Sequence, residues 1–138
     1  MIKSVYGTLL SSRRGSVAVE YAFLLPALLL FVLGIMDTGR LLWTNTTLNR
    51  AVQAAARCGA VNTVACASEA QIKSYAVDQA FGLSIAASAF TTSTPACGVQ
   101  VTASHTFTFI IPWLDPVSPF GPSNAITLSA VACYPPAQ

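Results

Sequence analysis

Charged side chains are scarce in this sequence. Only 9% of its 138 residues are charged and 54% are hydrophobic, whereas about a quarter of the residues of an average soluble domain carry charge. The few cations form no basic surface, because Lys3, Arg13 and Arg14 precede residue 16 and residues 16–138 are slightly acidic. Nucleic-acid-binding proteins carry a basic patch, so the charge pattern argues against a nucleic-acid partner.

The sequence also lacks the residue combinations that catalysis usually requires. His105 is the only histidine, and no serine-elbow motif, carboxylate pair or glycine-rich phosphate loop occurs. There is no Cys-x-x-Cys pair, which argues against a zinc site. We therefore expect a protein that is not an enzyme and that has no catalytic residue, metal site or cofactor.

Apolar residues are abundant, above all between Val17 and Met36. This run of about 20 residues is long enough to cross a hydrocarbon core of about 30 Å as a helix. A secretory signal has a shorter apolar core with a small-x-small cleavage site just beyond it, and the Asp37-Thr38-Gly39-Arg40 segment offers no such site. The upstream cations predict a cytoplasmic N-terminus and an exported segment 37–138, although Arg40 opposes that bias.

A short basic leader, a glycine and a lone carboxylate surround the start of the apolar run. The leader ends in Arg13-Arg14-Gly15, and Glu20-Tyr21 follows at the edge of the run. A charge is expensive beside lipid, so Glu20 needs a reason to be there. Cleavage after Gly15 would supply one, because the new α-amino group could neutralise this carboxylate.

Four further motifs follow the leader and Glu20-Tyr21. They are Leu24-Leu25-Pro26, Gly34-Ile35-Met36-Asp37, Gly39-Arg40-Leu41-Leu42-Trp43 and Ala54-Ala55-Ala56-Arg57. The order of motifs from residue 13 to residue 60 resembles that of the TadE-like minor pseudopilins, which belong to the tight-adherence (Flp) type IV pilus systems of bacteria. The remaining residues match no family motif.

The resemblance implies a structural subunit that prepilin peptidase cuts between Gly15 and Ser16. Glu20 and Tyr21 would serve subunit register and assembly, with the Glu20 carboxylate meeting the Ser16 ammonium of its own or a neighbouring subunit. The implied partners are the peptidase, other pilins and pseudopilins, the inner-membrane assembly platform and the lipid bilayer. The implied location is the bacterial inner membrane, with a single pass and a periplasmic head, and the pilus surface after assembly.

An alternative is an unprocessed single-span membrane protein whose periplasmic head scaffolds or binds another envelope protein. A retained leader would favour it.

Pro26 leaves a second question open, because it removes one helical hydrogen bond. The kink could be merely tolerated in lipid, or it could let the helix bend when subunits pack into a filament.

Helical periodicity extends beyond the membrane run. A three- and four-residue spacing links Leu41, Asn45, Leu48, Val52 and the pair Ala55/Ala56, and Gly59 is a plausible residue after the helix end. A second helix is predicted from Ser68-Glu69-Ala70-Gln71, which fits a capping box, to about Ala87. Its apolar face should contain Ile72, Tyr75, Ala76, Gln79, Ala80 and Leu83.

From Cys97 onwards the apolar residues alternate with polar ones, which predicts a strand up to Ile111 with His105 on its apolar face. Residues 112–124 should form a loop and 125–134 the return strand. Ile126 and Leu128 are out of phase with Val131 and Cys133, so we expect a bulge near Ser129-Ala130. The segment from Trp113 to Phe120 could be a contact surface or could fold back on its own core.

All four cysteines, Cys58, Cys66, Cys97 and Cys133, follow the apolar run. We expect disulfides, as in a periplasmic protein. Three pairings are possible, and chain geometry favours Cys58–Cys66 across a turn and Cys97–Cys133 at the ends of two strands. The predicted fold is α+β: a leader (1–15), a long transmembrane, pilin-type helix (16–58, span about 17–36) and a small periplasmic head (59–138) with a shorter helix and an antiparallel β-hairpin or sheet.

Overall fold

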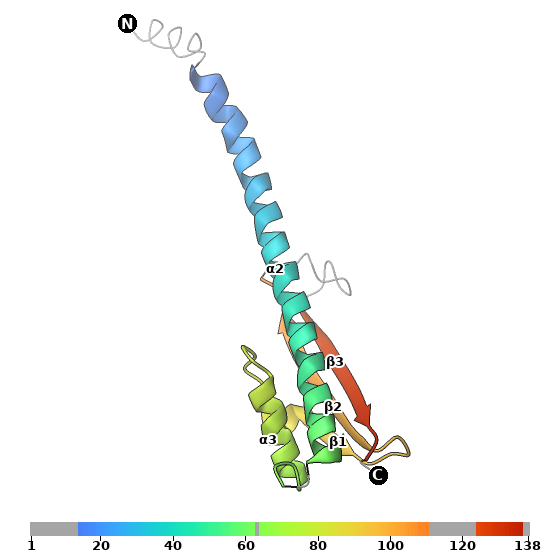
Figure 1. Ribbon diagram of the computed structural model, residues 1–138. Coiled ribbons are helices and arrows are strands. Elements are labelled where there is room, and N and C mark those ends of the chain that lie inside the picture. The colour runs from blue at the N-terminus through green and yellow to red at the C-terminus, as the bar shows by residue number, and fades with distance from the viewer. Residues whose placement is uncertain (1–13, 63, 111–123, 137–138) are drawn as a thin grey trace, which may run out of the picture. The chain divides into compact units, whose positions relative to one another are not determined.

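The structure is a computed structural model that describes residues 14–62, 64–110 and 124–136. Its elements run in the order helix, helix, 3-10 turn and three strands (Figure 1). These are α2 (Arg14–Val61), α3 (Glu69–Gln79), η1 (Ala87–Ala89), β1 (Phe90–Ser93), β2 (Val99–Thr108) and β3 (Ala125–Tyr134). The predicted α+β class is confirmed. The chain divides into two compact units, Met1–Met36 and Asp37–Gln138.

The described part of the first unit is helical throughout, and Pro26 lies inside the helix. Its large apolar side chains, from Val17 to Met36, are all exposed. A helix that is apolar around its whole circumference belongs in lipid or among other apolar helices. By length and composition, this part of α2 can cross a membrane.

In the second unit, α2 buries one face and exposes the other. Leu48, Ala51, Val52 and Ala55 are fully buried, whereas Asn45 is exposed. Asn45, which shares the three- and four-residue spacing in the sequence, is therefore not part of the buried face. Thr44 takes its place, because it lies one turn before Leu48 and its hydroxyl donates to the carbonyl of Arg40 over 2.8 Å.

α2 ends at Val61, so Gly59 lies inside the helix and not just beyond it, as the sequence had predicted. The Asn62 side chain accepts hydrogen bonds from the amides of Val64 (3.2 Å) and Ala65 (2.9 Å), which turns the chain after the helix. Gly59 has a packing role instead. A Cβ there would lie 2.8 Å from Ile72 Cδ1 and 3.0 Å from Val99 Cγ1, so the ends of these two side chains pack directly against the glycine.

α3 begins as predicted and ends earlier than predicted. The Ser68 side chain accepts from the Gln71 amide, and the Gln71 side chain accepts from the Ser68 amide, completing the capping box. The helix stops at Gln79, well before Ala87. Gly82 follows with a φ of 77°, a left-handed conformation that turns the chain away from a helix.

The three strands form an antiparallel sheet in the order β1-β2-β3. β1 was not predicted; it pairs with β2 through Phe90 opposite Ala103. The predicted bulge near Ser129-Ala130 is wrong, because the β2–β3 register is unbroken across these residues. Leu128 and Ala130 stay on the core side, and Val131 is left 56% exposed on the other face.

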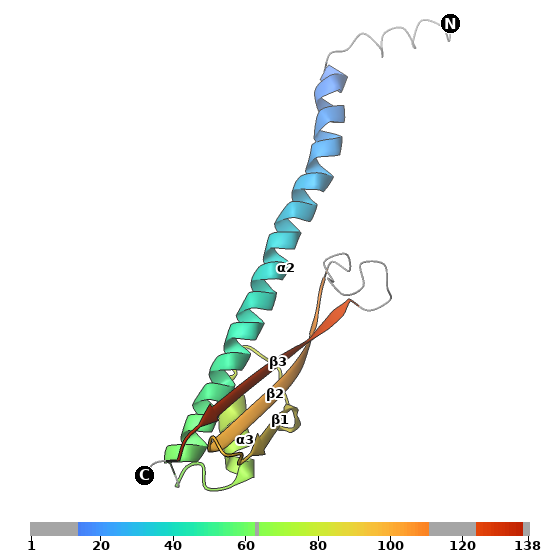
Figure 2. The same ribbon diagram turned by 90° about the vertical axis from the view of Figure 1, so that its right-hand side faces the viewer.

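α2 and α3 lie on the same side of the sheet, which Figure 2 shows from a second direction. The core between the helices and the sheet combines alanines and larger apolar residues from both. Its members include Leu48, Val52, Ala55, Ile72, Ala76, Ile85, Phe90, Val101 and Ala130. This core holds the second unit's share of α2 as one layer of the head.

Candidate functional site

The predicted cleavage site and Glu20 lie at the start of α2. Gly15 and Ser16 are within the helix, and Glu20 and Tyr21 are exposed, Tyr21 by 65%. Ser16 and Glu20 are four residues apart, which places both on one face of a helix, one turn from each other. An ammonium formed at Ser16 would therefore be within reach of the Glu20 carboxylate.

The first residue of the second unit, Asp37, carries a buried carboxylate with only 1% of the residue exposed. Arg40 Nη1 lies 2.8 Å from Asp37 Oδ1, and the Ile110 amide donates to Oδ2 over 2.7 Å. These contacts satisfy both oxygens, as a buried charge requires. The second contact joins α2 to the chain just beyond β2.

One aromatic ring lies against the arginine of this ion pair, and a second ring packs on the first. The Arg40 guanidinium lies 5.3 Å from the centroid of the Phe107 ring, and Phe107 meets Phe109 edge to face at 5.2 Å. Phe109 and Asn124 exchange two hydrogen bonds, from the Phe109 amide (2.7 Å) and from Asn124 Nδ2 (3.0 Å). We call Asp37, Arg40, Phe107 and Ile110 the Asp37 latch. It fixes this end of the β2–β3 pair to the helix.

Sequence reasoning missed this role. Asp37 and Arg40 were noted as parts of family motifs, but nothing assigned them a partner. Their i,i+3 spacing directly after an apolar run is a usable signal for the ion pair. The Ile110 contact has no such signal, because it spans 73 positions and depends on how the sheet packs.

The four cysteines form two disulfides, Cys58–Cys66 and Cys97–Cys133, with Cα atoms 5.8 Å and 6.3 Å apart. These are the pairs that chain geometry favoured. The first closes the turn between α2 and α3. The second joins the segment before β2 to the end of β3, so both ends of the β2–β3 pair are held.

The single histidine of the predicted strand lies at the edge of the core. His105 is half-buried on the core side of β2, opposite Leu128. Lys73 Nζ lies 2.6 Å from Glu69 Oε1, and this ammonium, helped by a hydrogen bond from Thr92, lowers the pKa of Glu69.

The described residues contain no cluster of three or more metal-ligating side chains. The Trp113–Phe120 segment lies outside the described residues.

Residues 15–57 match the family model described as TadE-like protein. The match confirms the resemblance that the motifs of this segment predict, and it contains Gly15, Glu20, Asp37 and Arg40. Residues 58–138 lie outside it. No curated protein and no solved structure matches the chain.

Proposed function

We propose that this TadE-like chain is a minor pseudopilin, a structural subunit that takes part in assembling a tight-adherence (Flp) type IV pilus. The observation that carries the proposal is the family match over residues 15–57, which starts at the glycine of the expected cleavage site. Prepilin peptidase would recognise Gly15 and cut before Ser16. Glycine suits that position because it has no Cβ to keep the protease from the backbone.

Glu20 gives the cut a physical purpose. The helix around it is apolar and exposed, so in lipid or in a helix bundle this carboxylate must be paired or neutral. The Ser16 ammonium, one helical turn away, can neutralise it, or a neighbouring subunit's ammonium can do so. An unpaired charge in a dry bundle costs several kcal/mol, so the pair would select one axial register between subunits.

The proposed location follows from the same segment. The apolar helix supports a single pass through a membrane, and Lys3, Arg13 and Arg14 favour a cytoplasmic N-terminus. The head would then lie in the bacterial periplasm, where disulfides such as Cys58–Cys66 persist. In this setting we assign the head to contacts with other pilus components rather than to catalysis.

Processing provides the direct test. The mass and N-terminal sequence of the protein from membranes should begin at Ser16 in cells with the peptidase, and should retain the leader in cells without it. Gly15→Val should block the cut and abolish assembly while the chain still inserts. Gly39→Val is the matched control, because a Cβ at Gly39 meets nothing within 4 Å.

Two results would contradict the proposal. A leader retained in wild-type cells that contain the peptidase would favour the unprocessed, single-span scaffold. Normal cleavage of Gly15→Val would show that Gly15 is not the recognised site.

A further inference from the structure

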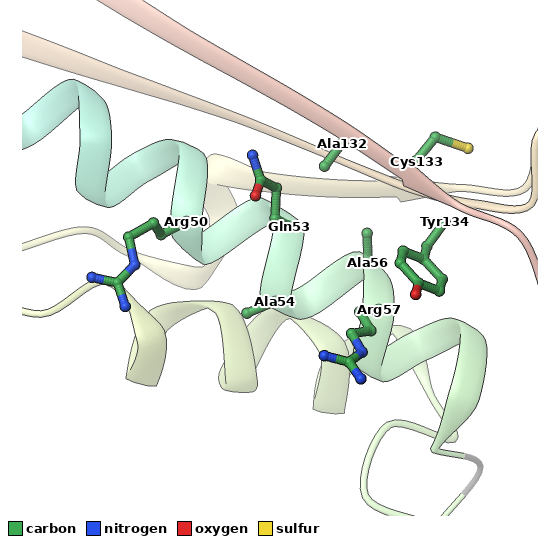
Figure 3. A pocket seen from close by; sticks show the side chains of 8 residues that line it. All are labelled: Arg50, Gln53, Ala54, Ala56, Arg57, Ala132, Cys133 and Tyr134. Atoms are coloured by element: carbon green, nitrogen blue, oxygen red, sulfur yellow. The ribbon is translucent and has the colours of Figure 1, made fainter.

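The head has a groove between α2 and the end of β3, with a volume of about 420 Å³. Arg50, Gln53 and Arg57 line it from α2, and Tyr134 lines it from β3 (Figure 3). Both arginines are exposed, and Tyr134 is 39% exposed. The two arginines are seven residues apart on one helix, which separates them by about 10 Å along its axis.

These arginines have no acidic partner among the described residues. Arg40 pairs with Asp37, and Lys73 pairs with Glu69. The cations of the described head that stay outside these ion pairs are therefore both in one groove. Exposed arginines in a concave site favour a ligand that brings carboxylates, because a guanidinium binds a carboxylate with two hydrogen bonds.

An aromatic surface continues the groove along α2. A second cavity of about 280 Å³ shares Arg50 and Ala54 with the first, and Trp43 and Phe81 also line it. Trp43 is 64% exposed and Phe81 is 71% exposed. Tryptophan, tyrosine, phenylalanine and arginine are the residues enriched at protein interfaces. We call the combined surface the arginine groove: Trp43, Arg50, Gln53, Ala54, Arg57, Phe81 and Tyr134.

We propose that the arginine groove docks an acidic segment of a different protein. The segment would carry two carboxylates about 10 Å apart, the separation of two residues that lie two turns apart on a helix. It would also carry an apolar side chain that packs against Trp43 and Phe81. The described part of a second copy of this chain fits poorly. Among the described residues, Glu20 and Asp78 are the acids outside the two ion pairs, and they belong to different units. The described part of a second head would therefore offer one such acid, Asp78, for two arginines.

The test places a photo-cross-linking amino acid at Gln53, which lies between the two arginines in the sequence and lines the same groove. The full chain is produced in its own cells, and these cells are irradiated. The peptide that becomes cross-linked to residue 53 is then identified by mass spectrometry. Charge-complementary contacts steer association and fix its register. Arg50→Gln with Arg57→Gln should therefore reduce the cross-linked product at least about tenfold, whereas Lys73→Gln, which removes a cation outside the groove, should leave it unchanged.

A charge swap makes the test specific. Arg50→Glu with Arg57→Glu should abolish the product, and replacing the two acids of the mapped segment by lysine should restore it. Both disulfides, checked by non-reducing peptide mapping, report that each variant folds. A product insensitive to the arginines, a product with this chain itself, a product with lipid alone, or no product would each overturn the proposal.

The inference adds a partner to the proposed function without depending on the cut before Ser16. Measuring the N-terminus in the same cells separates the two. A chain that is cut normally but gives no arginine-dependent product refutes only the groove. A chain that gives the product with its leader retained refutes only the processing.

Discussion

Residues 17–36 and 37–61 belong to the same helix, yet they distribute their side chains in two different ways. In the first stretch the large apolar residues are exposed on every side. In the second, small and aliphatic residues are buried on one face, and Trp43, Arg50 and Arg57 lie on the other. The side chains of this one helix therefore suit two environments. The first stretch suits an apolar environment, and the second suits water on one face and the core of the head on the other.

The charges differ in the same way. Glu20 in the first stretch would gain a partner one turn away if the proposed cleavage creates an ammonium at Ser16. Asp37 in the second is already bonded to Arg40 and to the Ile110 amide. In the described residues, the acid of the first unit is therefore outside any ion pair, whereas the second unit pairs Asp37 with Arg40 and Glu69 with Lys73 and leaves Asp78 and the two groove arginines outside these pairs.

The largest effect is expected from Glu20. Glu20→Ala and Glu20→Gln should be cleaved and inserted but poorly incorporated into pili, because the charge that pairs with the ammonium is gone. Glu20→Asp should be intermediate, since the charge remains but its reach is shorter. Immunoblots of sheared pili against membranes measure the incorporated fraction. If Glu20→Ala is incorporated into pili as well as the wild-type chain, Glu20 does not set the register between subunits.

The second effect concerns the head alone. Replacing Cys97 and Cys133 by alanine should lower the free energy of unfolding by about 2–5 kcal/mol, because the bond restrains the unfolded chain across 36 positions. Chemical unfolding of the full chain in detergent micelles, followed by circular dichroism, measures this. The Cys58–Cys66 pair spans 8 positions, so its removal should cost less. The reverse order would contradict the loop-length argument.

A smaller effect is expected from Asp37→Asn, which keeps the shape of the side chain and removes its charge. The Arg40 pair is lost and one buried polar contact is weakened, which should cost about 1–3 kcal/mol in the same unfolding experiment. Hydrogen exchange should speed up at the Ile110 amide. Unchanged exchange there would mean that Asp37 does not hold this strand end.

The smallest effect belongs to Glu69. Lys73 and Thr92 lower its pKa in the folded state below the ordinary 4.5. The contribution to stability is therefore present above 4.5 and is lost as the pH falls through the lowered pKa of the folded state. Glu69→Gln should remove this part of the pH dependence while leaving the Asp37 latch intact. Unfolding curves at neutral and acidic pH test it, and an unchanged acid response would refute it.

Local signals in the sequence predicted much of this fold. The capping box at Ser68, the alternation along β2 and the apolar run of α2 each act over a few neighbouring residues. The α+β class follows from them. The TadE-like resemblance of residues 15–57 came instead from the order of their motifs, and the family match confirms it.

What the sequence did not reveal depends on contacts between distant segments. β1 is only four residues long, and its pairing with β2 identifies it. The bulge was predicted because Val131 looks like a core residue, but an unbroken register exposes it. Gly59 resembles a helix end, yet its role is to make room for Ile72. The hydrogen bond from the Ile110 amide to Asp37 also joins distant segments, so no local pattern in the sequence indicates it.

The Asp37 latch also has a consequence for the order in which the chain folds. Ribosomes and insertion machinery handle the chain from its N-terminus, and the Ile110 amide arrives 73 positions after the carboxylate that accepts its hydrogen bond. During that interval Asp37 has Arg40 within one turn but lacks the cover of β2. The bond between Asp37 and the Ile110 amide can therefore form only after residue 110 has been synthesised, and it closes a long loop within the second unit, which has an entropic cost.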